Sequence, residues 1–304
     1  MTTTALLPRA LMRATVRLTV RPTLGPNVPV NRQRRLLNAL SRIARLPRGT
    51  RTTRITLGGC PAVRLEQPGA DTTRAVLYLH GGGYTVGSPT THRALAAHLA
   101  AATGAPVYLL DYRLTPEHPY PAAVDDAVAA YQGLLETGLD PQRLAVAGDS
   151  AGGGLTLALR LRGTGVPLPA ALALISPWVD LALADPRVHD DRRDPLLRTA
   201  WLHACPQRYG AGADLSAPEL SPLFGDLAGL PPMLVHAGSE EILLAAVERL
   251  VEQARAAEVA VDYQRLERMW HVAHLHAGLV GASTAAVHQI GAFLRESTTR
   301  VTAP

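Results

Sequence analysis

The stretch from Leu144 to Gly154 constrains the fold most, because it joins an apolar run to a Gly-x-Ser-x-Gly turn and then to a second apolar run. Glycines on both sides of Ser150 would let a strand and a helix pass closely. This strand–turn–helix pattern is typical of a nucleophile elbow, which lifts a serine hydroxyl above the edge of a sheet. It also places the N–H of Ala151 at a helix N-terminus, where it can stabilise an oxyanion. Alone, the motif also fits a glycine-rich turn with an incidental serine.

The rest of the chain alternates short apolar runs with longer helical patterns. We predict strands at residues 54–57, 62–65, 75–79, 106–110, 144–147, 171–175, 232–236 and 261–264. Helices are predicted at residues 5–20, 31–46, 91–102, 122–136, 153–161, 240–257 and 283–295. Such alternation predicts an α/β fold with a mostly parallel sheet of about eight strands covered on both faces. The first two strands are expected to form an antiparallel pair around Gly58 and Gly59.

Two segments stand outside this alternation. Residues 181–222 are rich in Asp, Arg and Pro, with helical fragments at 196–209, and are predicted to form an insertion above the sheet. Residues 1–50 precede the strands. We therefore expect an N-terminal helical cap or arm at 1–50 and a catalytic domain at 51–304 that carries the insertion.

A second glycine-rich turn, His80-Gly81-Gly82-Gly83, directly follows the predicted strand at 75–79. Successive glycines let the backbone approach a ligand and point N–H groups at it, which suits an oxyanion hole. The end of a strand is also where α/β sheets bind ligands. This position argues against a merely flexible turn.

A serine nucleophile needs a base, and the base needs an orienting acid. In an α/β hydrolase the chain order is serine, acid, histidine. After Ser150, the strand at 232–236 leads to Glu240 and Glu241, and the strand at 261–264 leads to His271. The two glutamates compete for the role of the acid.

Neither a metal nor an organic cofactor is expected. His271, His274 and His276 cluster in sequence, but their spacing matches no zinc motif. Cys60 and Cys205 lie far apart and predict neither a disulfide framework nor a metal site.

The charge is distributed unevenly along the chain. Twelve of the 30 basic residues, all of them arginines, lie in residues 1–54, which contain no Asp or Glu. With a net charge of +5 for the whole chain, the other 250 residues carry −7. A basic amphipathic arm is a candidate membrane-surface helix, but we favour a lid over the active site. Because no apolar run approaches the ~20 residues of a membrane span and arginines interrupt any secretory signal, we expect a cytoplasmic protein.

Together these motifs resemble the hormone-sensitive-lipase-like family of α/β-hydrolase carboxylesterases. The resemblance extends from about Val76 to Leu294. Its segments are the two glycine motifs, residues 111–119, residues 176–180 (Ser-Pro-Trp-Val-Asp) and residues 230–232 (Leu-Pro-Pro).

The resemblance implies a role for individual residues. Gly82, Gly83 and Ala151 would supply the oxyanion hole, and Glu241 rather than Glu240 would be the acid. The stretch 111–119 would brace the oxyanion loop, while the cap would line the acyl and alcohol pockets. Tyr84 and Trp178 are expected to contact the substrate.

We therefore expect a serine carboxylesterase that hydrolyses short- to medium-chain acyl esters through Ser150, Glu241 and His271. The expected partner is a small-molecule ester and not nucleic acid; a homo-oligomer stays open. Alternatives are a lactone or arylacetamide hydrolase and a membrane-associated lipid-ester hydrolase. A non-catalytic binding module, as in the gibberellin receptors that resemble this family without its histidine, is disfavoured by His271.

Overall fold

The computed structural model describes residues 6–25, 27–157, 165–185, 187 and 191–299. Its strands are β1 (Arg51–Leu57), β2 (Cys60–Glu66), β3 (Ala75–Leu79), β4 (Val107–Leu110), β5 (Leu144–Asp149), β6 (Ala171–Ile175), β7 (Met233–Gly238) and β8 (Val261–Leu266). Its helices are α1 (Arg9–Thr19), α2 (Val30–Ser41), α3 (Pro89–Thr103), α4 (Ala122–Glu136), α5 (Ala151–Thr156), α7 (Thr199–Gly210), α8 (Leu244–Ala256) and α9 (Gly281–Thr299). The 3₁₀ turns are η1 (Pro141–Arg143), η3 (Pro222–Phe224) and η4 (Ala273–His276).

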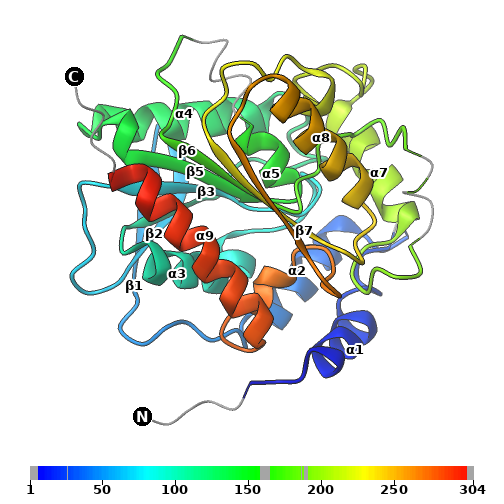
Figure 1. The fold of residues 1–304 in the computed structure, drawn as a ribbon. Coiled ribbons are helices and arrows are strands. Elements are labelled where there is room, and N and C mark those ends of the chain that lie inside the picture. Colours follow the sequence, from blue (N-terminus) through cyan, green and yellow to red (C-terminus); the bar gives the residue numbers. More distant parts are fainter. Residues whose placement is uncertain (1–5, 26, 158–164, 186, 188–190, 300–304) are drawn as a thin grey trace.

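The eight strands form one twisted sheet in the order β1-β2-β4-β3-β5-β6-β7-β8 (Figure 1). β2 pairs antiparallel with β1 and β4, and every other neighbouring pair is parallel. The predicted α/β class, the strand number and the antiparallel opening pair are confirmed. β5 lies in the middle of the sheet, so the serine that follows it is flanked by strands on both sides.

Apolar helices cover both faces of the sheet. α3 and α9 pack on one face, where strand residues such as Val76, Ala145 and Ala173 form a core with Leu95 and Ile290. α4, α5 and α8 pack on the other face, over the alternate strand residues. Parallel strands buried on both faces read as continuous apolar runs, which explains why the sequence located them. Figure 1 shows α3 and α9 in front of the strands.

The helix bounds differ from the sequence expectation at several ends. α1 begins at Arg9 and α2 ends at Ser41 rather than at residue 46. α5 runs only to Thr156, and the end of the predicted helix at 158–161 lies outside the described residues. α8 starts at Leu244, since residues 239–243 form a turn instead of the first helical turn. That turn carries both candidate acids.

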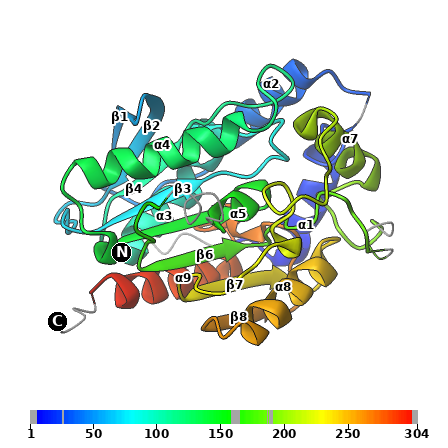
Figure 2. The same cartoon turned by 90° about the horizontal axis from the view of Figure 1, so that it is seen from above.

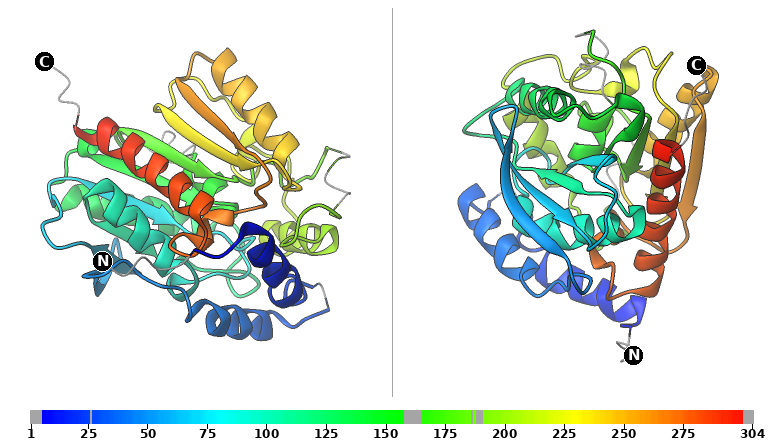
Figure 3. Two further views of the ribbon diagram at one scale, coloured as in Figure 1. Left: turned by 60° about the horizontal axis from the view of Figure 1, so that its bottom comes forward. Right: turned by 90° about the vertical axis from the view of Figure 1, so that its left-hand side faces the viewer.

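The two segments predicted to form a cap lie at one end of the sheet. The arrowheads of β6 and β7 point toward α1 and α7 in Figure 2, and Figure 3 shows α1, α2 and α7 together on that side. α7 comes from the 181–222 insertion and begins at Thr199, three residues later than expected. The indole N–H of Trp201 on α7 donates to Gln33 on α2 at 3.0 Å, so the two segments are joined by a buried hydrogen bond.

Candidate active site

Ser150 occupies a strained turn between β5 and α5. Its φ of 52° and ψ of −121° lie outside the regions that residues with side chains ordinarily adopt. Such strain persists only where the surroundings enforce it. A Cβ on Gly152 would lie 2.0 Å from the carbonyl oxygen of Leu79, so a side chain there is excluded by β3. The turn therefore has the strained strand–turn–helix geometry of a nucleophile elbow, and the role of Ser150 stays a prediction.

His271 meets the serine at this point. Its Nε2 lies 2.8 Å from Ser150 Oγ, within hydrogen-bonding distance, although the two residues are 121 positions apart. Both side chains are buried. This distance is what proton transfer from a serine hydroxyl to a base requires.

Glu241 lies behind His271. Its Oε1 is 3.9 Å from His271 Nδ1, and both of these buried atoms have no hydrogen-bond partner among the described residues. Its Oε2 accepts hydrogen bonds from the Ser176 hydroxyl at 2.6 Å and from the Gly238 N–H at 2.8 Å. Long catalytic hydrogen bonds in the free state commonly shorten when substrate binds. The pair Oε1 and Nδ1 is thus arranged for such a contact.

The neighbouring Glu240 points elsewhere. Its carboxylate pairs with the guanidinium of Arg13 on α1. Of the two candidate acids, only Glu241 is placed beside the imidazole.

The charges around His271 favour its protonated form. Burial lowers the pKa of the imidazole, but the neighbouring carboxylate of Glu241, with the charges of Asp194 and Asp149, outweighs burial. The pKa of His271 therefore lies above its ordinary value. A raised pKa makes the imidazole a stronger base for the serine proton.

Three backbone N–H groups lie in two adjacent turns, the glycine loop after β3 and the turn at Ser150; a Cβ on Gly81 in the first would lie 3.0 Å from Ser150 Cβ. They belong to Gly82, Gly83 and Ala151, and they donate no hydrogen bond to any described residue. Gly82 and Gly83 both have positive φ, at 121° and 59°. Free N–H donors beside a nucleophile can bind the oxygen of a tetrahedral intermediate.

Asp149 braces the glycine loop after β3 and makes no hydrogen bond to the imidazole of His271. Its Oδ1 accepts from the Gly81 N–H at 3.0 Å and from the Tyr78 hydroxyl at 2.8 Å, while Oδ2 lies 3.2 Å from His92 Nε2. Burial opposes ionisation, but His92 and the hydrogen bonds outweigh it and lower the pKa of Asp149. Asp149 is thus a fixed anion behind the loop.

The stretch 111–119 supports the same loop, as expected. The Tyr112 hydroxyl donates to the His80 carbonyl at 2.6 Å, and the Thr115 N–H donates to the Tyr84 carbonyl at 2.8 Å.

The two expected substrate contacts, Tyr84 and Trp178, are buried within the protein. Tyr84 stacks on Tyr209 of α7 with ring centroids 3.8 Å apart, and the Trp178 indole N–H donates to the Asp180 carbonyl. Both residues therefore have protein partners, and their contact with substrate stays a prediction.

Sequence reasoning missed two groups at this site. The Ser176 hydroxyl links Glu241 to the histidine loop, because it also accepts the Val272 N–H at 3.2 Å. Asp194, from the insertion, accepts the N–H of Ile242. Two sequence signals pointed to Ser176: its place after β6, at the same edge as Ser150, and the family segment 176–180 that it opens.

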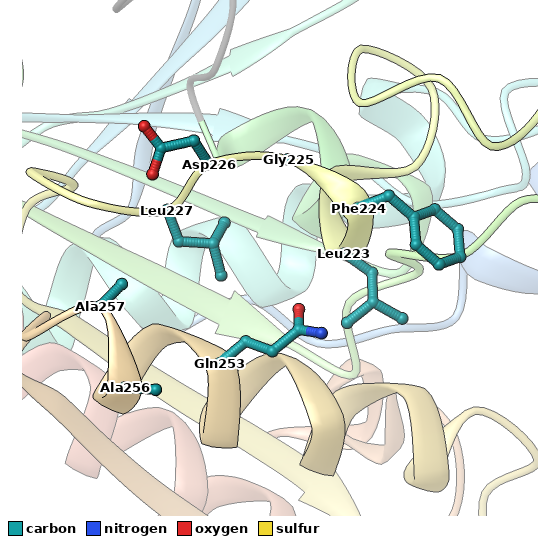
Figure 4. A pocket seen from close by; sticks show the side chains of 8 residues that line it. All are labelled: Leu223, Phe224, Gly225, Asp226, Leu227, Gln253, Ala256 and Ala257. Carbon is teal, nitrogen blue, oxygen red and sulfur yellow. The ribbon is translucent and has the colours of Figure 1, made fainter.

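No group of three or more His, Cys, Asp or Glu suited to hold a metal ion occurs among the described residues. A separate surface pocket lies between η3 and α8 (Figure 4), lined by Leu223, Phe224, Gly225, Asp226, Leu227, Gln253, Ala256 and Ala257. It is lined by one carboxylate and one amide among apolar side chains, and neither Ser150 nor His271 contributes to it.

Comparison with known proteins agrees with this geometry. The family model for the α/β-hydrolase fold matches residues 76–275. An acetyl-hydrolase of Streptomyces hygroscopicus is 46% identical over 248 residues, covering 80% of this chain and 82% of that protein. A carboxylesterase/phospholipase (LipF) of Mycobacterium tuberculosis is 33% identical over 273 residues, which cover 84% of this chain and 72% of that protein. A crystal structure of an esterase from the bacterial hormone-sensitive lipase family superposes with a TM-score of 0.91 at 38% identity. The match covers 96% of this chain and 100% of that protein.

Proposed function

This chain belongs to the hormone-sensitive-lipase-like family of α/β-hydrolase carboxylesterases, and from this we propose that it hydrolyses short- to medium-chain acyl esters through Ser150, His271 and Glu241. It is a serine hydrolase acting on carboxylic ester bonds. The observation that supports the proposed triad most is the 2.8 Å separation of the buried atoms Ser150 Oγ and His271 Nε2.

The reaction proceeds by acyl transfer to water. His271 takes the Ser150 proton as Oγ attacks the ester carbonyl carbon, and the N–H groups of Gly82, Gly83 and Ala151 hold the oxyanion. Glu241 orients the imidazole and stabilises its charged form. His271 then protonates the leaving alcohol and deprotonates a water, which attacks the acyl carbon of the acyl-enzyme. His271 returns this proton to Ser150 Oγ as the bond between the acyl carbon and Oγ breaks and the carboxylic acid leaves.

We assign residues 1–50 and the 181–222 insertion to a cap over this site. The cap supplies α7, whose Trp201 and Cys205 lie within 3.2 Å of where a Cβ of Gly83 would be. Because cap side chains lie this close to the oxyanion loop, acyl-chain preference is set there. A lactone or an arylacetamide would use the same triad, so substrate profiling separates these alternatives.

The experiment is hydrolysis of p-nitrophenyl esters from acetate to palmitate by the wild type, Ser150→Ala and Ser216→Ala. Ser216 is an exposed serine that donates to Asp214 and serves as the matched control. We expect the highest turnover on short to medium chains, its loss in Ser150→Ala and its retention in Ser216→Ala. A fluorophosphonate probe, followed by mass spectrometry, should label the wild type at Ser150. Ester turnover that persists in a folded Ser150→Ala would refute the mechanism.

One observation favours a second candidate function, hydrolysis of esters at a lipid surface. Leu11 and Leu18 are 53% and 76% exposed and lie seven residues apart on α1, so they share one helix face. The surrounding arm is basic and lacks acids, which complements an anionic surface. No described helix is long and apolar enough to span a membrane, so such an association would be peripheral.

Point substitutions test this candidate better than removal of the arm. Met12 and Val16 of α1 pack against Met269 and Trp270, so deleting α1 would also disturb the histidine loop. Sedimentation with phosphatidylserine vesicles should fall in Leu11→Ser/Leu18→Ser and in high salt, while Thr15→Ser on the same helix keeps it. Equal sedimentation by both variants, or none by the wild type, would remove this candidate.

A further inference from the structure

Asp194 is a buried carboxyl group in the 181–222 insertion, with 1% of its surface exposed. Three backbone N–H groups point at it. Its Oδ1 accepts from Leu196 at 2.8 Å and Leu197 at 3.1 Å, and its Oδ2 accepts from Ile242 at 3.3 Å. The first two bonds fix its own turn. The third reaches across 48 residues to the loop that carries the candidate acid.

The Ile242 bond restrains the backbone directly after Glu241. On the preceding side, the Gly238 N–H holds the Glu241 side chain through Oε2. The loop is thus fixed on both sides of the acid. Because Glu241 Oε1 is still 3.9 Å from His271 Nδ1, a small displacement of this loop decides whether the two atoms can bond.

Asp194 also interacts with His271 electrostatically. The charge of Asp194 is one of the influences that raise the pKa of His271. Burial raises the pKa of the Asp194 carboxyl, and the charge of His271 acts in the opposite direction. A negative charge here therefore favours the imidazolium that forms when Ser150 gives up its proton.

The N-terminal arm holds the segment that carries Asp194. The guanidinium of Arg21, itself buried, donates to the Asp194 carbonyl oxygen at 2.7 Å and pairs with the Asp191 carboxylate at 2.9 Å. Arg21 sits just after α1, and Asp194 five residues before α7. A continuous series of contacts therefore runs from the arm through the insertion to the loop of the acid.

We propose that Asp194 is a positioning residue for hydrolysis: it holds the Glu241 loop through the Ile242 N–H and stabilises the charged form of His271. This inference rests on the proposed triad, in which Glu241 and His271 act on Ser150. It makes the cap part of the catalytic apparatus as well as a boundary of the substrate pocket. Asp194 touches neither Ser150 nor the substrate, so it acts through other residues.

Asp185 offers a matched control within the same insertion. It is 6% exposed, and its Oδ1 accepts the Arg187 N–H at 2.8 Å in the same local turn that Asp194 makes. Its carboxylate pairs with the Arg187 side chain. Among the described residues it forms no hydrogen bond to the Glu241 loop. Asp185→Asn therefore removes a buried carboxylate from the same insertion and leaves the acid loop as it is.

The experiment compares Asp194→Asn and Asp185→Asn by kcat and KM on p-nitrophenyl acetate from pH 5 to 9, with thermal unfolding of each. For Asp194→Asn we expect kcat to fall on the order of 10- to 100-fold with little change in KM, and the acidic limb of kcat/KM to move to lower pH. For Asp185→Asn we expect both properties to match the wild type. The inference would be overturned if a folded Asp194→Asn kept the wild-type kcat and the wild-type acidic limb of kcat/KM. It would also be overturned if Asp185→Asn lost kcat to the same extent.

A third variant covers failure of Asp194→Asn to fold. Asp194→Glu keeps the negative charge, so the acidic limb of its kcat/KM profile should stay at the wild-type pH. If this limb moved to lower pH, the result would count against the electrostatic role of Asp194. Fluorophosphonate labelling separates this inference from the proposed function. If the wild type labels at Ser150 while Asp194→Asn labels at the same rate, only the role of Asp194 fails. If the wild type neither labels nor turns over ester, the triad itself fails.

Discussion

The Ser176 hydroxyl donates a 2.6 Å hydrogen bond to Oε2 of Glu241, and both groups are buried. Ser176 follows β6, has a φ of 47° and also accepts the N–H of Val272, the residue after His271. One hydroxyl therefore connects the loop of the acid to the loop of the base. A hydrogen bond to a charged group contributes about 1.5–3 kcal/mol, so this contact bears directly on the triad.

We predict that Ser176→Ala lowers kcat about 10- to 100-fold while substrate binding changes little, because Glu241 loses a donor and can turn away from His271. Ser221→Ala is the matched control: Ser221 is also buried, accepts one N–H and donates to one carbonyl, but it does so within the insertion. Steady-state kinetics and unfolding temperatures of both variants test this. Similar kcat values for the two would mean that the Ser176 bond only supports the fold.

The pH dependence of hydrolysis should report the raised pKa of His271. The imidazole must be neutral to accept the serine proton, so kcat/KM should rise with pH and level off above that pKa. Glu241→Gln removes the main influence that raises the pKa and leaves burial, which lowers it. In this variant we expect the acidic limb at lower pH and kcat reduced by about 10²- to 10⁴-fold.

Glu240→Gln is the control for this pH experiment. It alters the adjacent carboxylate, which pairs with Arg13 and not with the imidazole. Its acidic limb and its kcat should stay close to wild type. A profile in which Glu240→Gln and not Glu241→Gln loses activity would exchange the two assignments.

Buried neutral histidines should make the protein sensitive to acid. Burial lowers the pKa of His236 to about 4; burial together with the charge of His92 lowers that of His80 to about 3. Below pH 6.5 these residues take up protons in the unfolded chain but not in the folded one. The free energy of unfolding should therefore fall by about 1.4 kcal/mol per pH unit for each of them between pH 6.5 and pH 4. His271, whose pKa is raised, adds stability as the pH falls toward 6.5 and contributes no slope below it.

Urea unfolding at pH 7.5, 6 and 5 measures this slope. His236 lies against His274, with Nδ1 3.1 Å from Nε2. His236→Gln should reduce stability at pH 7.5 but flatten the pH slope by one residue's contribution. An unchanged slope in His236→Gln would show that His236 is not the group that titrates.

The fold and the strained turn at Ser150 could be predicted because their signals are local. A parallel strand buried on both faces is an uninterrupted apolar run, and the elbow needs its glycines at fixed positions next to Ser150. The end of β7 likewise marked the turn with Glu240 and Glu241. The choice between them rested on a family pattern, since adjacent residues in a turn point in different directions and only the folded backbone decides which faces His271.

The supporting residues could not be predicted because their roles depend on long-range contacts. Asp194 lies in an insertion without periodicity, and its bond to Ile242 spans 48 residues. The arginines of α1 read as a basic face for solvent or a membrane surface. In the structure Arg13 instead pairs with Glu240, and Arg9 donates to the Glu267 carbonyl in the histidine loop. Spacing alone does not show which side of an amphipathic helix is covered.

Gly82 combines a strained backbone with a free N–H, which makes it the sharpest test of the oxyanion hole. Its φ is 121°, and a Cβ there would lie 2.1 Å from the Val86 carbonyl oxygen. Gly82→Ala must therefore move the loop that supplies the donors. We predict a loss of about 10²- to 10³-fold in kcat, the effect of removing one oxyanion donor, together with about 1–3 kcal/mol of stability.

Gly59→Ala is the control that isolates backbone strain from loop displacement. Gly59 has a φ of 82° in the turn between β1 and β2, and a Cβ there would meet nothing within 4 Å. Its substitution should cost about 1–2 kcal/mol of stability and leave kcat unchanged. Steady-state kinetics and thermal unfolding of the two variants decide the matter. If Gly82→Ala loses stability but keeps the kcat of Gly59→Ala, the oxyanion is held elsewhere.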